Sequence, residues 1–400
     1  MEEERNTMYT FKEDISQREY NEFIENYSAA SILQEYNWAN VKSNWGNFHV
    51  GLYKDDTLVA VALILVRTFK GVKIFYVPRG YLIDFTNKSD LAEMTKHIKL
   101  LARKNKAFMV RIDPNFCAQQ YTFKRKEAVD HYTKDYIIKD ANLKALGYKK
   151  IPTAKEMGHN WQPEFNILAP CCNKDLELLT VDEILGTYKS KFKYYIGAFH
   201  EKRGVSFEIT QDKSRLKDFV NILKETEQRQ NIRLRNEEYF DTLMESYKNA
   251  YLVFGTIDLN AYIDFLKGNN GKEEEINNAL RLREEKGEKM ILSASLMVLP
   301  SNKKGIRTSE YLYAGNSSEL MKLRASTGLV FEIIKFSCEN KCHYCNLGGV
   351  DGNLNDHLTM FKEKFNGQVL EFAGEYDLVI NKPLYFMFNK AMPLLRKMLH

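Results

Sequence analysis

The stretch VKIFYVPRGYLIDFTNKSDLAEMTKHIKLLARKNKAFMVRIDP, residues 72–114, decides the fold class. Its β-rich start, 72–78, predicts a strand that ends at a Pro-Arg-Gly turn. Asp90 is a candidate helix cap, and the apolar residues that follow it recur near the helical period: Leu91, Met94, Ile98 and Leu101. Residues 108–112 predict a second strand, stopped by an Asp-Pro pair. This alternation of strand, helix and strand indicates an α/β fold.

The same alternation extends on both sides of this stretch. Ser16 and Glu19 have the spacing of a capping box, which predicts a helix over 16–27. Further helices are expected at 182–202, 215–227, 236–250 and 325–337. Further strands are expected at 48–53, 57–66, 205–210, 251–257, 290–299, 307–313 and 343–347. We therefore expect an α/β (α+β) protein built from two units of related design.

One segment departs from this alternation. Residues 258–288 contain two helical stretches on either side of a Gly-Asn-Asn-Gly sequence. The first stretch has an apolar stripe, and the second is rich in acidic and basic residues that suit a solvated face. A short antiparallel helical hairpin that projects from the second unit fits this pattern.

Composition and charge limit the class of protein. The 400 residues are 44% hydrophobic and 28% charged, which is typical of a folded globular chain, and the net charge of +5 does not by itself indicate a nucleic-acid partner. The first ten residues lack the apolar core of an export signal, and the apolar run 57–66 is too short to cross a bilayer. The apolar tail 384–399 predicts a packed or membrane-surface helix. We expect a cytoplasmic protein without disulfides among its six cysteines.

Cys338, Cys342 and Cys345 have the C-x3-C-x2-C spacing that holds an iron–sulfur cluster in radical SAM enzymes. Their position argues against that function, because the 55 residues after Cys345 are too few to build a barrel. The structural alternative is a helix that ends near Cys338, a turn, and a strand through Cys345. A zinc site with His343 lacks an evident fourth ligand nearby.

Two further segments carry candidate chemistry. Residues 188–203 combine basic and aromatic side chains, which suits contact with RNA, although an amphipathic helix with solvated lysines fits the pattern equally well. In Phe361-Lys362-Glu363-Lys364-Phe365, a lysine between aromatic residues could present its ammonium group to a cleft near developing negative charge.

Taken together, eight stretches in order along nearly the whole chain resemble the Fem family of peptidoglycan bridge-forming aminoacyltransferases. These stretches are 34–42, 76–80, 110–114, 159–163, 310–316, 346–352, 361–365 and 375–383. The sequence departs from the family pattern at Cys345, where an acidic residue is often found, and in the 258–288 hairpin, which is a short version of the family's helical arm.

The resemblance implies two acetyltransferase-like domains, 1–155 plus 375–400 and 156–374, with 258–288 as an inserted arm. It also implies the transfer of an amino acid from an aminoacyl-tRNA to the lysine side chain of the stem peptide in a lipid-linked or UDP-linked peptidoglycan precursor. A lipid-linked acceptor would bring the protein into peripheral contact with the inner membrane surface. Neither a cofactor nor a metal is implied.

The resemblance further implies which residues bind the acceptor. Lys42 matches a residue that contacts the precursor's phosphates. Arg235 and Tyr239 match another phosphate and sugar contact, and their spacing of four places them on one face of the predicted helix. Tyr311 and Tyr313 alternate on a predicted strand and would face the peptide channel or pack in the core. Two residues in matched stretches complete the substrate-binding set: Arg79 and Asn316.

Lys362 is the main catalytic candidate by the same resemblance, because it could position the donor carbonyl and counter the oxyanion, with Phe361 packed beside it. Asp113 is the candidate proton acceptor, or a turn residue at a strand end. Alternatives to the stem-peptide function are a tRNA-dependent transferase that acts on another amine, such as a protein N-terminus, and a non-catalytic nucleic-acid-binding module.

Overall fold

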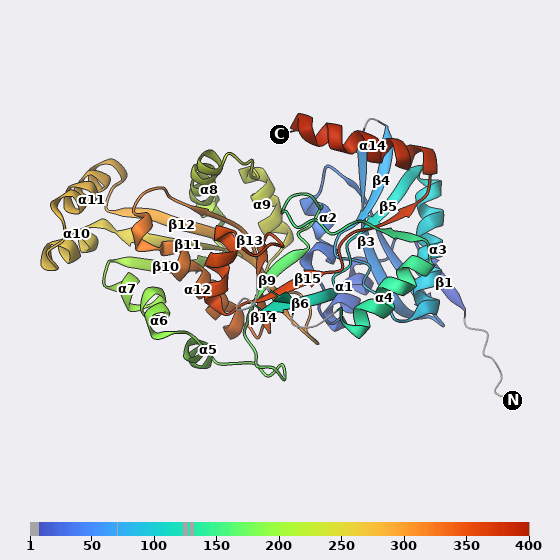
Figure 1. Ribbon diagram of the computed structural model, residues 1–400, viewed down its shortest axis with the longest axis horizontal. Helices are drawn as coiled ribbons and strands as arrows, with labels where there is room; N and C mark the ends of the chain where they lie inside the picture. The colour runs from blue at the N-terminus through green and yellow to red at the C-terminus, as the bar shows by residue number, and fades with distance from the viewer. Residues whose placement is uncertain (1–7, 70, 123–126, 129–131, 400) are drawn as a thin grey trace.

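The computed structural model describes residues 8–69, 71–122, 127–128 and 132–399. Within these residues the chain forms two β-sheets with helices packed against their faces, and the two sheets lie side by side along the long axis of the molecule (Figure 1). The mixed α/β class expected from the sequence is confirmed.

The first sheet has seven strands in the order β1-β2-β3-β4-β5-β16-β8. They are β1 (Tyr9–Lys12), β2 (Gly46–Lys54), β3 (Thr57–Phe69), β4 (Val72–Val77), β5 (Ala107–Ile112), β8 (Tyr148–Lys150) and β16 (Tyr376–Val379). The parallel pair β4 and β5 is joined by α3 (Lys88–Lys104), as the opening stretch predicts. The expected cap is wrong: the Asn87 side chain accepts from the Asp90 amide, so Asp90 lies in the first turn.

The helices of the first unit are α1 (Gln17–Asn26), α2 (Trp38–Val41), α3, α4 (Lys134–Ala145) and α14 (Lys382–Leu399). The capping box of Ser16 and Glu19 at the start of α1 is confirmed, with both reciprocal hydrogen bonds present. Helix α14 returns to the first sheet, where Phe388 packs against Phe108 of β5. No helix in the described part of the chain is both long and apolar enough to span a membrane.

The second sheet has nine strands in the order β10-β11-β12-β13-β14-β9-β15-β6-β7. They are β6 (Cys117–Thr122), β7 (Glu127–Ala128), β9 (Phe165–Pro170), β10 (Val205–Thr210), β11 (Ala250–Asp258), β12 (Lys289–Val298), β13 (Thr308–Asn316), β14 (Tyr344–Gly349) and β15 (Gln368–Phe372). The parallel pair β13 and β14 is joined by α12 (Ala325–Glu339), the second occurrence of the strand–helix–strand pattern.

The remaining helices of this unit are α5 (Val181–Thr187), α6 (Ser190–Ile196), α7 (Ala198–Glu201), α8 (Leu216–Gln230), α9 (Glu237–Ser246) and α13 (His357–Lys362). The single helix predicted over 182–202 is wrong, because it is three short helices. The breaks fall at Tyr188 and Lys189, which are extended, and at Gly197, whose φ and ψ of −132° and −107° lie outside the helical region.

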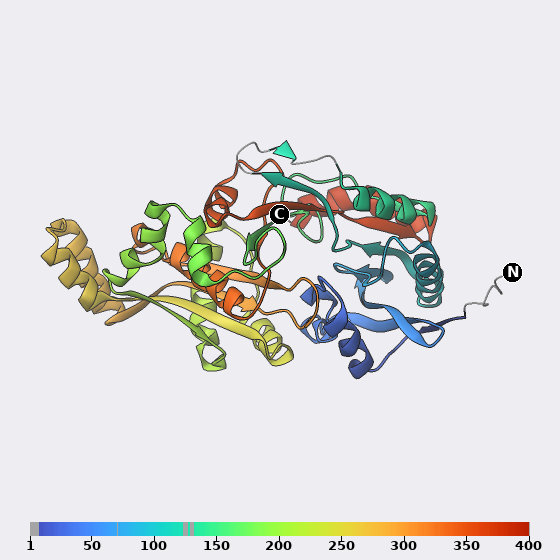
Figure 2. The same cartoon turned by 90° about the horizontal axis from the view of Figure 1, so that it is seen from below.

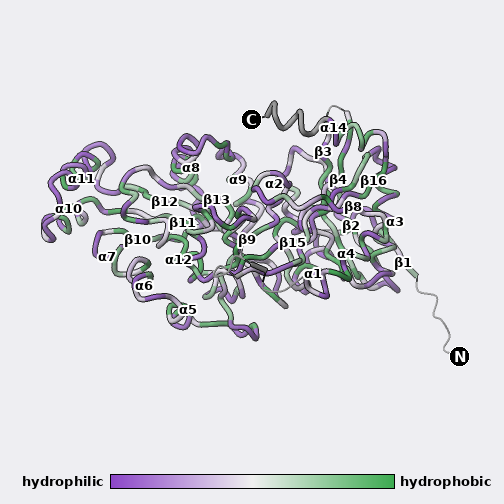
Figure 3. The backbone as a smooth tube through the Cα atoms, in the orientation of Figure 1, coloured by the Kyte–Doolittle hydropathy of each residue, from purple (hydrophilic) through white to green (hydrophobic). Residues whose placement is uncertain are grey.

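Helices α10 (Leu259–Gly268) and α11 (Glu273–Lys286) form an antiparallel pair at the end of the molecule farthest from the first sheet (Figure 2). Tyr262, Ile263 and Leu282 pack in a hydrophobic cluster with residues of β11 and β12. Helix α11 is mainly hydrophilic along its length (Figure 3). The pair therefore rests on the sheet by a small apolar base and presents a polar outer surface.

The two units exchange strands. Strand β16, near the C-terminal end of the chain, lies between β5 and β8 in the first sheet. Strand β6, which follows β5 directly in sequence, pairs instead with β15 in the second sheet. The division into 1–155 plus 375–400 and 156–374 therefore stays a prediction, and β6 and β7 are the strands whose sheet differs from it.

The two units also share one hydrophobic cluster. Trp38 of α2 and Leu63 of β3 belong to the same cluster of buried residues as Phe240 of α9 and Leu296 of β12. Across this boundary, the Tyr247 hydroxyl donates to the Ile32 carbonyl at 2.8 Å. The shared core holds the facing surfaces of the two sheets in a fixed relation, so a cavity between them has rigid walls.

Candidate active site

A cavity of about 320 Å³ lies between the two units. On the first side its walls come from α2 and the turn after β4, and on the second side from β9, β13, β14 and β15. Five of the residues singled out from the sequence line it: Lys42, Arg79, Arg235, Tyr311 and Tyr313. The fold therefore brings together residues that are far apart in the chain.

A larger groove, about 730 Å³, lies over α8 and strands β10 to β12. Its arginine, Arg215, is already paired with Glu208 at 3.0 Å and Asp218 at 2.7 Å. None of the residues singled out from the sequence lines this groove. The smaller cavity is therefore the better candidate for the site.

Two cations without a carboxylate partner in the described residues mark one end of the cavity. Lys42 follows α2, and its Nζ lies 5.0 Å from the ring centroid of Trp38 and 5.3 Å from that of Tyr239. The Arg235 guanidinium lies 5.2 Å from the Tyr239 ring. Burial and the positive charge of Arg235 lower the pKa of Lys42 to about 8. An anion bound between the two cations would relieve this repulsion.

The predicted helical placement of Arg235 is wrong. Asn236 caps α9, so Arg235 precedes the helix and does not share its face with Tyr239. The two side chains still meet, because the turn before the cap folds Arg235 over the Tyr239 ring. Tyr239 in turn hydrogen-bonds through its hydroxyl to the Tyr313 hydroxyl at 3.0 Å.

Strand β13 carries both cavity tyrosines, but a bulge separates them. Leu296 and Met297 of β12 pair with Tyr313 and Tyr311, so Leu312 is the extra residue. Strict alternation is broken, and the prediction of one common face is wrong: Tyr313 packs with the cluster that contains α9, and Tyr311 packs with the cluster on the α12 side. Both tyrosines nevertheless reach the cavity.

Arg79 and Asp113 form a buried unit behind the cavity wall. The Asp113 carboxylate accepts from the Arg79 amide at 2.6 Å and from the Tyr76 hydroxyl at 2.9 Å. Asp113 is only 2% exposed and does not line the cavity, whereas the Arg79 side chain does, and it donates to the Pro163 carbonyl at 2.8 Å. Burial raises the pKa of Asp113 to about 6. This geometry suits a role for Asp113 in positioning the turn that carries Arg79.

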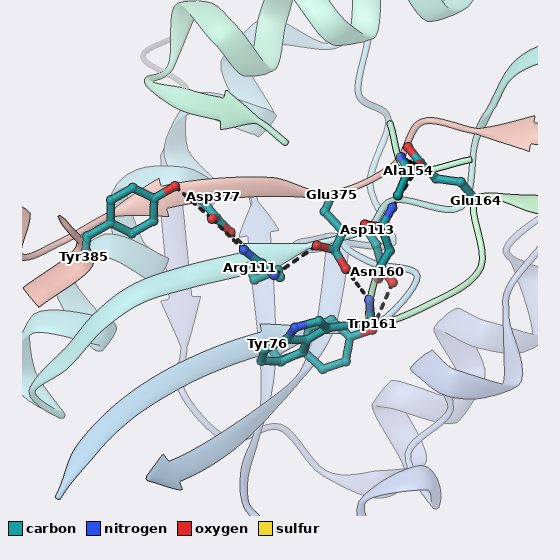
Figure 4. A network of polar contacts seen from close by, with 10 residues as sticks. All are labelled: Tyr76, Arg111, Asp113, Ala154, Asn160, Trp161, Glu164, Glu375, Asp377 and Tyr385. Atoms are coloured by element: carbon teal, nitrogen blue, oxygen red, sulfur yellow. Dashed lines mark hydrogen bonds and ion pairs between the residues drawn. The ribbon is translucent and has the colours of Figure 1, made fainter. Parts of the chain in front are cut away.

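A second polar network, next to Asp113, holds the chain segment that lines the cavity after Trp161 (Figure 4). Arg111 of β5 pairs with Glu375 at 2.9 Å and with Asp377 at 2.7 Å. Glu375 also accepts a hydrogen bond from the Trp161 amide. These contacts fix the connecting segment, whose next residues Gln162 and Pro163 line the cavity, against the C-terminal strand β16.

Lys362 lies at the end of α13, only 4% exposed. Its Nζ donates to the Gly349 carbonyl at 2.8 Å, and Gly348 and Gly349 line the cavity. Burial lowers the pKa of Lys362 to about 7. Phe361 packs against the ring of Phe365 at 5.7 Å, which fixes the turn of helix that carries the lysine. Lys362 itself does not line the cavity but lies directly behind its glycine wall.

The sequence did not single out Glu310 and Asn346 as site residues, although both line the cavity. They are cross-strand partners in β13 and β14, and the Asn346 amide donates to a Glu310 carboxylate oxygen at 2.8 Å. Asn316, which was singled out, lies at the other end of β13 and does not line the cavity; its backbone bonds to the side chains of Thr226 and Arg229.

The cysteines do not form a metal centre in the part of the chain that the structure describes, where no group of three or more metal-binding side chains converges. The Cys338 thiol donates to the Leu179 carbonyl at 2.7 Å, and Cys342 and Cys345 are fully buried. Burial raises the pKa of Cys342 to about 11 and that of Cys345 to about 12, so both stay protonated at neutral pH. The structure thus gives no support to the radical SAM alternative.

Comparison with known proteins places the chain in a family. The FemAB family model matches residues 15–280 and 269–392. The chain belongs to the FemAB family. Its relatives include the Lipid II:glycine glycyltransferases of Staphylococcus aureus strains bovine RF122 / ET3-1 and USA300, each 24% identical over 435 residues that cover 96% of this chain and 97% of the relative. The family resemblance of the sequence is confirmed.

Solved structures share this fold over most of the chain. The crystal structure of FemX matches with a TM-score of 0.75 and 22% identity, over 96% of this chain and 99% of that chain. A conserved protein of unknown function from Bacteroides thetaiotaomicron VPI-5482 matches with a TM-score of 0.50 and 10% identity, over 93% of this chain and 100% of that chain. At these identities the likeness shows the fold alone.

Proposed function

We propose that this chain is an aminoacyltransferase that moves an amino acid from an aminoacyl-tRNA to the stem peptide of a peptidoglycan precursor, with a lysine side-chain amine as the acceptor. The observation that carries the proposal is one rigid cavity that has two cations at one end, neither with a carboxylate partner among the described residues, and a buried lysine behind another wall. The relatives that align over nearly the whole chain are named Lipid II:glycine glycyltransferase.

The cationic end would bind the diphosphate of the acceptor. A guanidinium matches the geometry of phosphate oxygens, and a lysine adds a compact second charge. Lys42 and Arg235 face the cavity without carboxylate partners in the described residues, so a bound diphosphate would not compete with an internal ion pair. Tyr239 and Tyr313, linked through their hydroxyls, form an adjacent wall for the sugar and peptide portions.

The buried lysine would act on the donor. Attack of an amine on an aminoacyl ester creates a tetrahedral oxyanion, which a nearby positive charge stabilises. The Lys362 ammonium lies behind Gly348 and Gly349 and is held there by the Gly349 carbonyl. Because glycine has no side chain, an ester carbonyl could approach this ammonium closely. Asp113, sealed behind the wall, would position Arg79.

The donor sets the compartment. Aminoacyl-tRNA is a cytoplasmic substrate, so we propose that the reaction takes place in the cytoplasm, and that a lipid-linked acceptor is met at the inner face of the membrane. The two acetyltransferase-like units and the short α10–α11 arm belong to the same proposal. The small apolar base of that arm supports a role outside the catalytic cavity.

Mass spectrometry of purified precursors incubated with the protein and total charged tRNA tests this function. We expect a mass increase of one amino acid residue on a UDP-linked or lipid-linked muramoyl pentapeptide, located by fragmentation on the lysine side chain. Uncharged tRNA is the control. Transfer to a protein N-terminus but to neither precursor would instead identify a tRNA-dependent enzyme with another acceptor.

A further inference from the structure

Glu310 is the one residue with a carboxyl group among the described residues that line the cavity. It lies on β13, and it is partly exposed to the cavity rather than sealed behind the wall. One oxygen, Oε2, accepts from the Asn346 amide at 2.8 Å. The other, Oε1, has no hydrogen-bond donor among the described residues. The carboxylate is therefore held in place by one oxygen and offers the second.

Glu310 occupies a special position in the sheet. The parallel ladder between β13 and β14 pairs Thr308, Ser309 and Glu310 with Tyr344, Cys345 and Asn346, and it ends at the Glu310–Asn346 pair. Beyond that pair the two strands separate, and Gly348 and Gly349 line the cavity. Glu310 thus lies where the sheet opens toward the reaction centre.

The same short segment of β14 connects Glu310 to Lys362. The Asn346 side chain donates to Glu310 and accepts from the Gly348 amide at 2.9 Å. At the next residue, the Gly349 carbonyl accepts from the Lys362 ammonium at 2.8 Å. A carboxylate and an ammonium are therefore held at the two ends of one four-residue segment.

We propose that Glu310 is the catalytic residue that receives the proton of the acceptor amine; this inference rests on the proposed function. Asp113, the carboxylate expected from the sequence, has both oxygens engaged by Arg79 and Tyr76 and does not line the cavity. Glu310 does line the cavity, and its Oε1 accepts no hydrogen bond from the described residues.

The surroundings of Glu310 suit proton acceptance. Burial raises the pKa of Glu310 to about 7, while the positive charge of Arg79 and the Asn346 hydrogen bond lower it. The Cys345 thiol lies nearby on β14, where it pairs with the neighbouring Ser309, and burial raises its pKa to about 12, so it is neutral at pH 7. A base that titrates near the working pH is both available in its ionised form and strong enough to accept a proton.

The step balances as follows. The amine begins as an ammonium ion, and Glu310 takes one of its protons, which exposes the nitrogen lone pair. The nitrogen forms a bond to the ester carbonyl carbon, and the bond from that carbon to the ribose oxygen breaks. The nitrogen then loses a second proton, the ribose oxygen takes one proton to become a hydroxyl, and one proton is released to solvent. The Lys362 ammonium faces the transient oxyanion and keeps its own proton.

Kinetics of E310Q test the chemical role. In the wild type we expect kcat/KM to rise with pH on the acidic side of 7 as Glu310 loses its proton, and to fall on the alkaline side as the Lys362 ammonium loses its own. E310Q keeps the shape and the Asn346 contact but accepts no proton, so kcat should fall about 10²- to 10⁴-fold and the rise on the acidic side of pH 7 should disappear. KM for the precursor should rise by no more than about 10-fold, because the charge-assisted contact to the amine is lost. E285Q, on the exposed outer part of α11, is the matched control.

Binding provides a readout that needs no donor. The probes are UDP-muramoyl pentapeptide with lysine at the acceptor position and the same molecule with norleucine, which lacks only the amine. A charge-assisted contact should make the wild type bind the lysine form about 10-fold more tightly, and E310Q should bind both forms about equally. Thermal melting of E310Q checks that the variant is folded.

The outcomes separate the two levels of the proposal. If the wild type transfers nothing from any aminoacyl-tRNA but still prefers lysine over norleucine through Glu310, the proposed function fails and the amine contact stands. If the wild type binds both probes equally, if E310Q keeps the preference, or if D113N rather than E310Q loses the rise near pH 7, then Glu310 is not the proton acceptor.

Discussion

Replacement of Lys362 by methionine should abolish transfer and, at the same time, stabilise the protein at acidic pH. The lysine is 4% exposed, and burial lowers its pKa from 10.5 to about 7. At about 1.4 kcal/mol per pKa unit, holding the charged form in the fold destabilises the wild type by roughly 5 kcal/mol below pH 7. Methionine has a similar length and no charge, so the substitution removes this destabilisation.

The gain is partly offset. The Gly349 carbonyl loses its donor in the variant, which costs about 1–3 kcal/mol. Below pH 7 the net stabilisation is then roughly 2–4 kcal/mol. Because the folded-state pKa is lower than the unfolded one, the wild-type penalty fades as pH rises from 7 toward 10.5. Lys362→Met should therefore be more stable than the wild type at pH 6 and less stable near pH 10.

Urea denaturation at pH 6, 7.5 and 10 measures the first effect, and single-turnover transfer to a purified precursor measures the second. Loss of one oxyanion-stabilising group lowers the rate about 10²- to 10³-fold. Lys364→Met is the matched control, since it removes the same charge from an exposed position two residues away. Transfer within about 2-fold of the wild type would refute the catalytic role; a stability difference that does not change with pH would refute the buried-charge reasoning.

The other expected outcomes concern the two ends of the cavity and the thiols. Lys42→Met and Arg235→Met should each raise KM for the diphosphate-containing precursor about 10-fold or more, with little change in kcat. Neither variant should change the slow reaction of a stem peptide that lacks phosphate. Equal losses of activity on both acceptors would contradict the anion site. Gly348→Ala should reduce transfer and destabilise the fold by about 1 kcal/mol, because Gly348 has a φ of +81° and the new Cβ would lie 3.6 Å from the Lys362 Nζ. The control is Gly71→Ala, at a position that also has a positive φ but has open space around it. The same rate and denaturation assays on both variants separate backbone strain from crowding of the lysine. Cys342→Ala should retain full transfer, and elemental analysis of the purified wild type should find no stoichiometric iron; loss of activity together with a bound metal would revive a metal-dependent function.

The sequence predicted those parts of the fold that depend on local pattern. The period of apolar residues and the turn residues located α3 and the strands around it, and the capping box located α1. The family resemblance predicted the site residues Lys42, Arg79 and Arg235, which the fold gathers around one cavity. Such features are encoded within short windows, where periodicity and turn chemistry are informative.

The features that the sequence did not predict depend on partners far along the chain. The bulge that turns Tyr311 and Tyr313 to different clusters exists only because of the register with β12. The placement of β6 in the second sheet depends on β15, which lies far along the sequence. Glu310 was not recognised because a glutamate beside a tyrosine on a strand does not by itself indicate a site. Its role depends on the contact with Asn346 and on its place in the cavity wall, which only the structure shows.

The position of β16 has a consequence for synthesis of the chain. Strand β5 emerges from the ribosome early. Its second neighbour in the sheet is β16, which also connects it to β8, and β16 is synthesised only when residues 376–379 appear. Until then one edge of β5, whose residues are all buried in the folded protein, has no partner strand. Such an unpaired edge can pair with strands of other chains. We expect chaperones to protect this intermediate, and premature stop codons shortly before residue 376 to yield insoluble protein instead of a smaller folded one.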